Sequence, residues 1–239
     1  MGSRSTAEAR AMLSSEELGI ILLSLKVALC SVAFSLPLAI IIAYVLARFD
    51  FAGKTLLDAL VHLPLVLPPV VVGYALLLIF GKQGALGAWL DRWLGIVFAF
   101  RWTGAALAAA IMGFPLMVRA IRLSMAAVDR RLETLARTLG AARVRVFVSV
   151  TLPLALPGIV TGALLSFARS LGEFGATITF VSNIPGETET LPLAIYSLTQ
   201  TPGGDAQALR LSIIAVALSI AALIASEWLT RRASSHQRS

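Results

Sequence analysis

The stretch Asp129-Arg-Arg-Leu-Glu-Thr-Leu-Ala-Arg-Thr-Leu-Gly140 is an arginine-rich segment between two long apolar runs, and it decides how we interpret the whole chain. Its apolar residues follow the i, i+3, i+4, i+7 spacing of one helix face: Leu132, Leu135, Ala136 and Leu139. Asp129 suits the N-cap and Gly140 the helix end. Glu133 stands four residues before Arg137, so we expect these two side chains to pair. Such a two-sided helix beside a membrane either docks on a protein or lies on anionic lipid headgroups.

The composition outside this stretch is that of a membrane protein. Of the 239 residues, 58% are hydrophobic and 14% are charged, whereas a soluble domain is about half apolar and a quarter charged. A bilayer span needs about 20 apolar residues, and five runs qualify: residues 18–47, 56–80, 102–118, 150–168 and 211–229. We therefore predict an all-α integral membrane protein with five transmembrane helices. The expected divisions are a short polar segment 1–17, a transmembrane domain 18–232 with a polar loop at 129–149, and a tail 233–239. Residues 172–207 are expected to form a loop with short or re-entrant helical pieces.

The distribution of positive charge indicates the orientation and the partners. A net charge of +7 would suggest nucleic acid for a soluble protein. Here most arginines lie in short loops between the predicted spans, as the positive-inside rule requires of cytoplasmic loops. We expect the lipid bilayer and not nucleic acid as a partner. Five spans with these loops inside place the N-terminus outside and the C-terminus in the cytoplasm.

Few residues suit catalysis, metal binding or nucleotide binding. The only cysteine is Cys30 and the only histidines are His62 and His236, so we expect no metal site and no intrachain disulfide. Gly53-Lys54-Thr55 resembles the end of a phosphate-binding loop, but Arg48 stands where that loop needs its first glycine. No ionisable residue lies convincingly at the bilayer centre for ion coupling. We therefore expect a pathway without its own energy source and without a bound cofactor.

Six polar or helix-breaking residues are candidates for a pathway or gate, each with a plain structural alternative. Pro68 and Pro69 remove two backbone donors, so the chain there bends beside a water-filled path or packs as a simple kink. Arg169 and Glu173 are four residues apart, so Arg169 either contacts an anionic substrate or pairs with Glu173. Ser182 and Asn183 either bind an oxyanion transiently or end a helix.

The polar loop resembles the cytoplasmic signature loop of ABC importer permeases, which reads Glu-Ala-Ala, three residues, Gly, nine residues, then Ile-x-Leu-Pro. Aligned on Gly140, the glutamate of that pattern falls on Thr134, and Glu133 stands one residue early. The remaining matched positions are Leu135, Ala136, Val150, Leu152 and Pro153.

Three further stretches are similar to the molybdate permease subunits of that family, and the resemblance extends from about residue 18 to 232. They are Leu63–Gly73, Phe114–Arg122 and Ala168–Thr188, the last with the run Ser-Asn-Ile-Pro-Gly-Glu-Thr. Sulfate and thiosulfate permeases share the general outline and are the alternative. A channel outside this family or a membrane enzyme is a more distant alternative.

The resemblance implies a MetI-like permease that carries molybdate, and tungstate as a similar dianion, without a catalytic site of its own. Two copies form the pathway, a pair of cytoplasmic ATPase subunits holds the ATP and magnesium, and a periplasmic molybdate-binding protein delivers the substrate. The expected coupling residues are Asp129, Leu132, Glu133, Thr134, Leu135, Ala136, Leu139, Gly140, Leu152 and Pro153.

Overall fold

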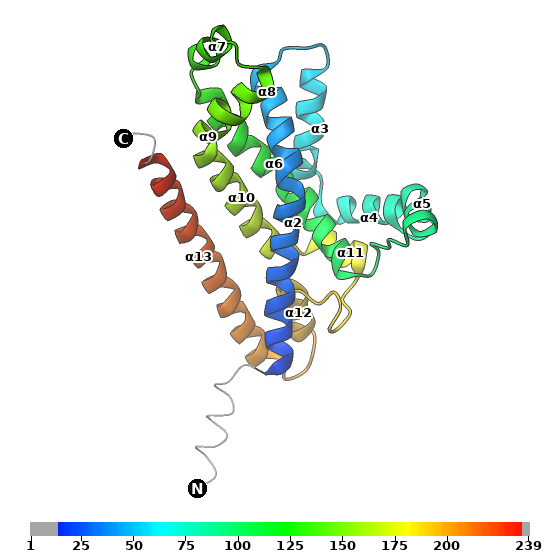
Figure 1. The fold of residues 1–239 in the computed structure, drawn as a ribbon. Coiled ribbons are helices and arrows are strands. Elements are labelled where there is room, and N and C mark those ends of the chain that lie inside the picture. The colour runs from blue at the N-terminus through cyan, green and yellow to red at the C-terminus, as the bar shows by residue number, and fades with distance from the viewer. Residues whose placement is uncertain (1–13, 236–239) are drawn as a thin grey trace.

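The computed structural model describes residues 14–235, and this part of the chain is helical without any strand. Most of the predicted polar segment 1–17 and the last four residues of the predicted tail 233–239 lie outside the described residues. Four long helices form an elongated bundle (Figure 1): α2 (Ser15–Arg48), α6 (Trp102–Ala127), α10 (Leu156–Leu171) and α13 (Asp205–Ser235). Helix α6 lies at the centre of this bundle, packed against both α2 and α10.

Helix α2 begins three residues before the predicted start of the first span because its first turn is capped. The Ser14 hydroxyl accepts a hydrogen bond from the Glu17 amide, and the Glu17 carboxylate accepts one from the Ser14 amide. The Glu17 carboxylate also pairs with Arg210 of α13 at 2.7 Å. Helix α2 has 34 residues and is therefore about 51 Å long, which exceeds the bilayer core of about 30 Å.

The helices approach closely where small residues face each other. A Cβ atom on Gly113 of α6 would lie 2.3 Å from the Ser166 hydroxyl, and one on Gly158 of α10 would lie 2.1 Å from Cβ of Ser124. Gly162 of α10 meets the backbone of Met117 in the same way. Glycine at these positions allows the α6 and α10 backbones to pack in direct contact.

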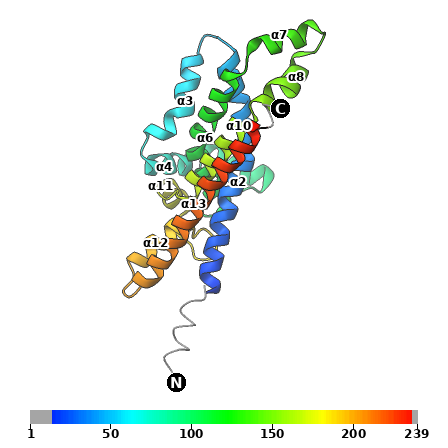
Figure 2. The ribbon, with the colours of Figure 1, turned by 90° about the vertical axis from the view of Figure 1, so that its left-hand side faces the viewer.

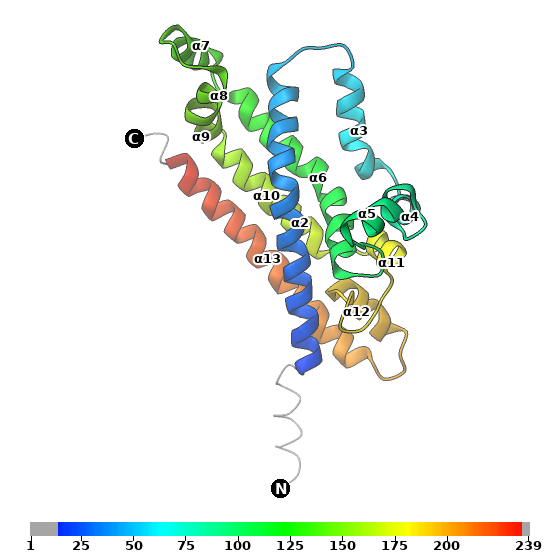
Figure 3. The same cartoon turned by 45° about the vertical axis from the view of Figure 1, so that its right-hand side comes forward.

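The second predicted span is not one straight helix. It divides into α3 (Lys54–Val66) and α4 (Pro69–Phe80), whose axes differ by 113°. Pro68 and Pro69 cause the break because neither residue has an amide hydrogen to continue the helix. Helix α4 and the amphipathic α5 (Ala85–Leu94) consequently project sideways from the bundle (Figure 3).

The fourth predicted span is also bent. After α7 (Arg130–Thr138) the chain forms α8 (Arg143–Val146), a π-helical turn (Phe147–Thr151) and α9 (Leu152–Leu154) before α10. The segment Arg143–Leu154 meets α10 at 68°, where Pro153 and Pro157 lack the amide hydrogens that would continue a regular helix. Among residues 14–235, three helices are long and apolar enough to cross a membrane, and the number reaches five when each bent pair counts as one span.

The other predicted spans are longer in the structure. The predicted span 102–118 continues as α6 to Ala127, and its Arg122 pairs with Asp58 of α3 at 2.6 Å. The predicted span 211–229 begins earlier, at Asp205 of α13. Within residues 172–207, the structure places two short helices, α11 (Gly175–Val181) and α12 (Leu191–Thr199).

The two ends of the bundle differ in content. Helices α7 and α8 lie at one end, together with the C-terminal ends of α2 and α13 (Figures 1 and 2). Helix α12 and the start of α2 lie at the opposite end. We call these the α7 end and the α12 end.

Candidate functional site

Helix α7 has well-defined caps at both ends. The Asp129 carboxylate accepts a hydrogen bond from the Arg131 amide at 2.9 Å, as the N-cap prediction requires. At the other end, Gly140 has a φ of +88°, which favours glycine. The Gly140 amide donates to the Arg137 carbonyl at 3.0 Å, and the Ala141 amide donates to the Ala136 carbonyl at 3.1 Å. This pair of hydrogen bonds is a Schellman motif, so the sequence fixes both ends of α7.

The apolar face of α7 is uncovered in the single chain. Leu132 is 45% exposed, Leu135 is 60% exposed and Leu139 is 88% exposed, whereas Ala136 is half-buried. Helix α7 projects beyond the end of the four-helix bundle (Figure 1). A contiguous apolar face on an otherwise charged helix marks an interaction surface.

Glu133 lies on a different face of α7 and joins the helix to the bundle. Its carboxylate pairs with Arg48 Nη2 at 2.8 Å and accepts a hydrogen bond from Thr151 Oγ1 at 2.7 Å. Arg48 is only 6% exposed, and it also donates to the Val128 carbonyl at 3.1 Å. The anchor formed by Glu133, Arg48 and Thr151 therefore connects α7 to the end of α2 and to the turn that precedes α10.

The predicted pair between Glu133 and Arg137 is wrong. No ion pair joins these residues in the described structure, because Glu133 turns instead to the buried guanidinium of Arg48. An ion pair shielded from water is stronger than an exposed pair along a helix. Nothing in the sequence pattern points to Thr151 as a partner of Glu133. The signal available for Arg48 was its position at the end of a predicted span, on the same side of the membrane as the polar loop.

The remaining predicted coupling residues are divided between solvent and core. Thr134 is exposed, and its hydroxyl donates to the Arg130 carbonyl of the preceding turn. Leu152 packs against the cluster of α2, α6 and α10 residues that includes Met117 and Ile121. Pro153 is exposed at the bend before α10.

The predicted pathway residues lie away from α7, around α4 and α11. Pro69 faces α11 so closely that a Cβ atom on Gly175 would be 2.7 Å from the Pro69 side chain. Gly73 packs equally closely, because its Cβ would lie 2.5 Å from the Ala176 carbonyl oxygen. Pro68 is exposed and Pro69 is half-buried. The bend therefore places α4 directly on α11.

Arg169 and Glu173 form the ion pair that their spacing predicts. Arg169 Nη1 lies 2.6 Å from Glu173 Oε2, and the Glu173 side chain is only 2% exposed. The other Glu173 oxygen accepts a hydrogen bond from the Ala176 amide at 2.9 Å, at the start of α11. Because Glu173 offsets the charge of Arg169, this contact favours the structural alternative for the arginine.

Ser182 and Asn183 lie in the loop that follows α11. Ser182 is the C-cap of α11 and has a φ of +63°. Its carbonyl accepts a hydrogen bond from the Thr188 hydroxyl, and that hydroxyl accepts one from the Ile184 amide. Burial raises the pKa of the Glu189 carboxyl, and a hydrogen bond from Asn183 partly offsets the rise. These contacts give both residues a role in closing the loop.

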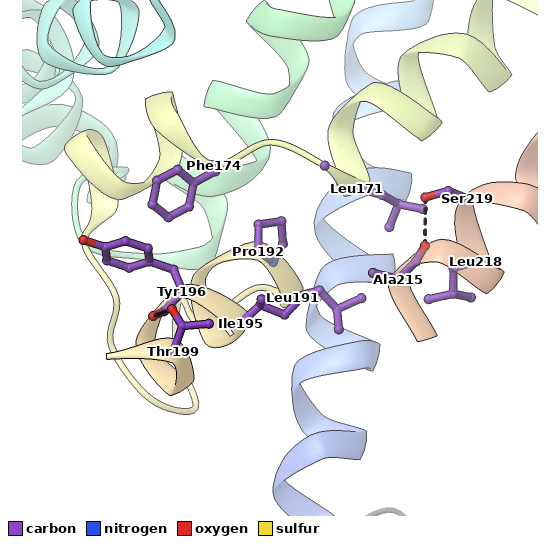
Figure 4. A pocket seen from close by; sticks show the side chains of 11 residues that line it. Leu171, Phe174, Leu191, Pro192, Ile195, Tyr196, Thr199, Ala215, Leu218 and Ser219 are labelled. Carbon is purple, nitrogen blue, oxygen red and sulfur yellow. Dashed lines mark hydrogen bonds between the residues drawn. The ribbon is translucent and has the colours of Figure 1, made fainter. Parts of the chain in front are cut away.

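A cavity of about 430 Å³ lies between the α10–α11 connection and helices α12 and α13. Figure 4 shows Phe174 and Tyr196 together on one side of it, with ring centroids 5.1 Å apart. Leu171, Leu191 and Ile195 continue an apolar lining. An apolar wall of this kind does not bind a dianion tightly, because it cannot replace the lost hydration.

Comparisons with known proteins agree with this arrangement. Residues 35–235 match the family described as binding-protein-dependent transport system inner membrane component. The molybdenum transport system permease protein ModB of Escherichia coli K12 is 61% identical over 220 residues, which are 92% of this chain and 96% of that protein. The sulfate transport system permease protein CysT of the same organism is 41% identical over 157 residues, 66% of this chain and 56% of that protein.

The fold also resembles a solved transporter. The structure of a bacterial alginate ABC transporter in complex with alginate pentasaccharide-bound periplasmic protein matches with a TM-score of 0.72. That match has 17% sequence identity and covers 92% of this chain and 80% of the other chain. The likeness identifies the fold as that of an importer permease.

Proposed function

This chain belongs to the family of binding-protein-dependent transport system inner membrane components, and we propose that it is the permease subunit of an ABC importer that carries molybdate into the cytoplasm. Tungstate, a dianion of the same shape, is a second substrate. The observation that carries the coupling part of this proposal is the exposed leucine face of α7, on a helix anchored to the bundle by Glu133. The chain is a multi-pass inner-membrane protein. It provides a pathway for the substrate and does not catalyse a reaction itself.

The leucine face is the surface on which a cytoplasmic ATPase subunit docks. ATP and magnesium are held by that ATPase, and this chain binds no cofactor. When the ATPase pair closes, the displacement of α7 passes through the Glu133–Arg48 pair to α2 and through Thr151 to α10. The nucleotide state of the ATPase thereby shifts the equilibrium between two arrangements of the transmembrane helices.

The pathway forms between two copies of this chain. Large apolar side chains are exposed along the single chain, among them Phe34 of α2 at 83% and Ile213 of α13 at 61%. Lipid and the second copy together cover such surfaces. The periplasmic binding protein docks at the α12 end, opposite the ATPase.

The orientation follows from the same arrangement. Arginines gather at the α7 end, which the positive-inside rule places in the cytoplasm. Helix α2 begins at the α12 end and α13 ends on the α7 side. We therefore place the N-terminus outside and the C-terminus inside.

Substrate discrimination rests mainly with the binding protein. Arg169 of α10 and Arg210 of α13 are each paired with a buried carboxylate. A path lined in this way releases an oxyanion readily and does not select tightly between dianions. Sulfate is therefore the alternative substrate, and the 41% identity to a sulfate permease supports this alternative.

The test is ATP-driven uptake into vesicles that contain this protein, its ATPase and its binding protein. Labelled molybdate is supplied alone and with excess sulfate. Molybdate uptake that requires ATP and is unaffected by sulfate supports the proposal. Uptake of sulfate in its place assigns the chain to the sulfate permeases, and uptake without ATP rejects an ABC importer.

A further inference from the structure

A second cavity lies at the α7 end, on the side of α7 away from the exposed leucines. Its volume is about 280 Å³, and it is enclosed by the end of α2, by α7 and by α8. The residues that line it are Tyr44, Arg48, Phe49, Arg130, Glu133, Thr134, Arg137, Arg143 and Val146. Unlike the cavity at the α12 end, this one is polar and basic, so we call it the arginine pocket.

The charges in the arginine pocket are unbalanced. Four guanidinium groups line it, and the single carboxylate is Glu133, which Arg48 already neutralises. Asp50, an exposed carboxylate near Arg130, is held by Lys54 at 2.7 Å. Within the part of the chain whose side chains are described, Arg130, Arg137 and Arg143 have no carboxylate within 4.0 Å. Three positive charges converging on one cavity repel each other unless an anion lies between them.

A buried donor in the same pocket is unsatisfied. The Nε atom of Arg48 is shielded from solvent and has no hydrogen-bond partner, although the side chain is only 6% exposed. A buried donor attached to a charged group costs free energy when it remains unpaired.

The rim of the arginine pocket is apolar. Tyr44, Phe49 and Val146 belong to its lining, and Phe49 is 44% exposed. Tyr44 stacks edge-on against Phe147 with ring centroids 4.6 Å apart. Aromatic and aliphatic side chains next to arginines at the cytoplasmic end of the bundle are typical of the membrane interface.

We propose that the arginine pocket binds a tetrahedral oxyanion of the phosphate type, held by Arg130, Arg137 and Arg143 beside the Glu133–Arg48 pair. Planar guanidinium groups match such an anion with paired hydrogen bonds. Two sources supply this chemistry: the phosphate of an anionic phospholipid in the cytoplasmic leaflet, and a free oxyanion such as phosphate or molybdate. Binding of the anion would hold α7 against α2 and α8, so the position of α7 depends on whether the arginine pocket is occupied.

The experiment measures binding to the purified full-length chain alone, which makes it independent of transport and of the proposed substrate. The protein is delipidated in a neutral detergent. One arm titrates phosphatidylglycerol against phosphatidylcholine and counts bound lipid by native mass spectrometry. The other arm titrates inorganic phosphate and molybdate and follows the melting temperature.

The test variant is Arg137→Gln/Arg143→Gln, and the control is Arg131→Gln/Arg145→Gln, which removes the same charge from exposed positions that do not line the pocket. We expect saturable binding in at least one arm and affinity at least ~10-fold weaker in the test variant, because two charge-assisted contacts are lost. The control should stay within about 3-fold, since distant exposed charges are screened by salt.

The pattern of the two arms identifies the source. Binding of phosphatidylglycerol alone assigns the pocket to a lipid headgroup, and binding of phosphate or molybdate alone assigns it to a soluble oxyanion. Absence of saturable binding in both arms overturns the proposal. Equal losses in the test and control variants also overturn it, because they would show only the diffuse effect of net charge.

Discussion

The α7 end and the α12 end of this protein both contain buried ion pairs, but they differ in their exposed helix faces and in their cavities. At the α7 end, leucines face outward and the charges of the anchor are buried, with Arg48 6% exposed. At the α12 end, the cavity is apolar, and Arg169 and Arg210 are paired with the buried carboxylates of Glu173 and Glu17. In the proposed importer, the α7 end would hold the ATPase firmly, whereas the α12 end would let the substrate pass.

The largest effect is expected from a substitution in the leucine face of α7, the proposed docking surface for the ATPase. We predict that Leu135→Asp weakens ATPase binding at least ~30-fold, because it places a charge at the centre of an apolar contact. Stability should change little, since Leu135 is 60% exposed in the free chain. Co-purification of the ATPase with the variant measures the effect. Thr138→Asp adds the same charge on another face of α7 and should retain the ATPase; equal loss in both variants would show that the leucine face is not the docking surface.

The next prediction distinguishes the role of the anchor from that of the docking surface. Glu133→Gln leaves the buried Arg48 guanidinium without its counterion, a loss of about 3–5 kcal/mol for buried pairs in general. We expect the variant to bind the ATPase but to transport poorly, because α7 is no longer fixed to α2. Uptake and ATP hydrolysis are measured together in vesicles.

The matched variant for this prediction is Glu133→Gln/Arg48→Gln. Removal of both charges should cost less than the sum of the single changes, since no unpaired buried charge remains. Strict additivity in melting temperature would contradict the anchor.

A smaller effect is expected at the α12 end. Arg169→Gln should lower the melting temperature because it leaves buried Glu173 unpaired. The half-saturating molybdate concentration should be unchanged if the arginine only balances Glu173. A rise of ~10-fold in that concentration, without loss of stability, would instead make Arg169 a substrate contact and weaken the contrast between the two ends.

The smallest effect concerns the loop after α11. Burial raises the pKa of Glu189 above 4.5, so the folded state holds the proton more tightly than the unfolded state. The stability that the Glu189 carboxyl contributes is fully present below pH 4.5, and it is lost as the pH rises through the folded-state pKa. We expect Glu189→Gln to flatten the decline in melting temperature as the pH rises above 4.5. An identical decline in both proteins would remove Glu189 as its source.

Sequence reasoning succeeded where structure is local. The apolar spacing of residues 132–139, the Asp129 cap and the Gly140 turn each depend on neighbours within one or two helical turns, and all three are present. It failed for the partner of Glu133, because Arg48 is distant in the sequence and only the packing of α7 beside α2 brings the two together.

The prolines illustrate the same limit. Pro68 and Pro69 predicted where the second span bends, but the angle of 113° depends on the glycine contacts between α4 and α11. The arginine pocket could not be predicted either, since its lining comes from three separate segments.

The most direct test of the central claim is disulfide cross-linking between α7 and the ATPase in a Cys30→Ser background, which removes the only native cysteine of this chain. Leu139→Cys places a thiol on the most exposed leucine of the docking face, and Arg131→Cys places one on a different face of the same helix. A cysteine is introduced in turn along the candidate ATPase groove. The account predicts that Leu139→Cys forms a cross-link whose yield changes with nucleotide and that Arg131→Cys does not. Equal cross-linking from both positions, or none from Leu139→Cys, would contradict it.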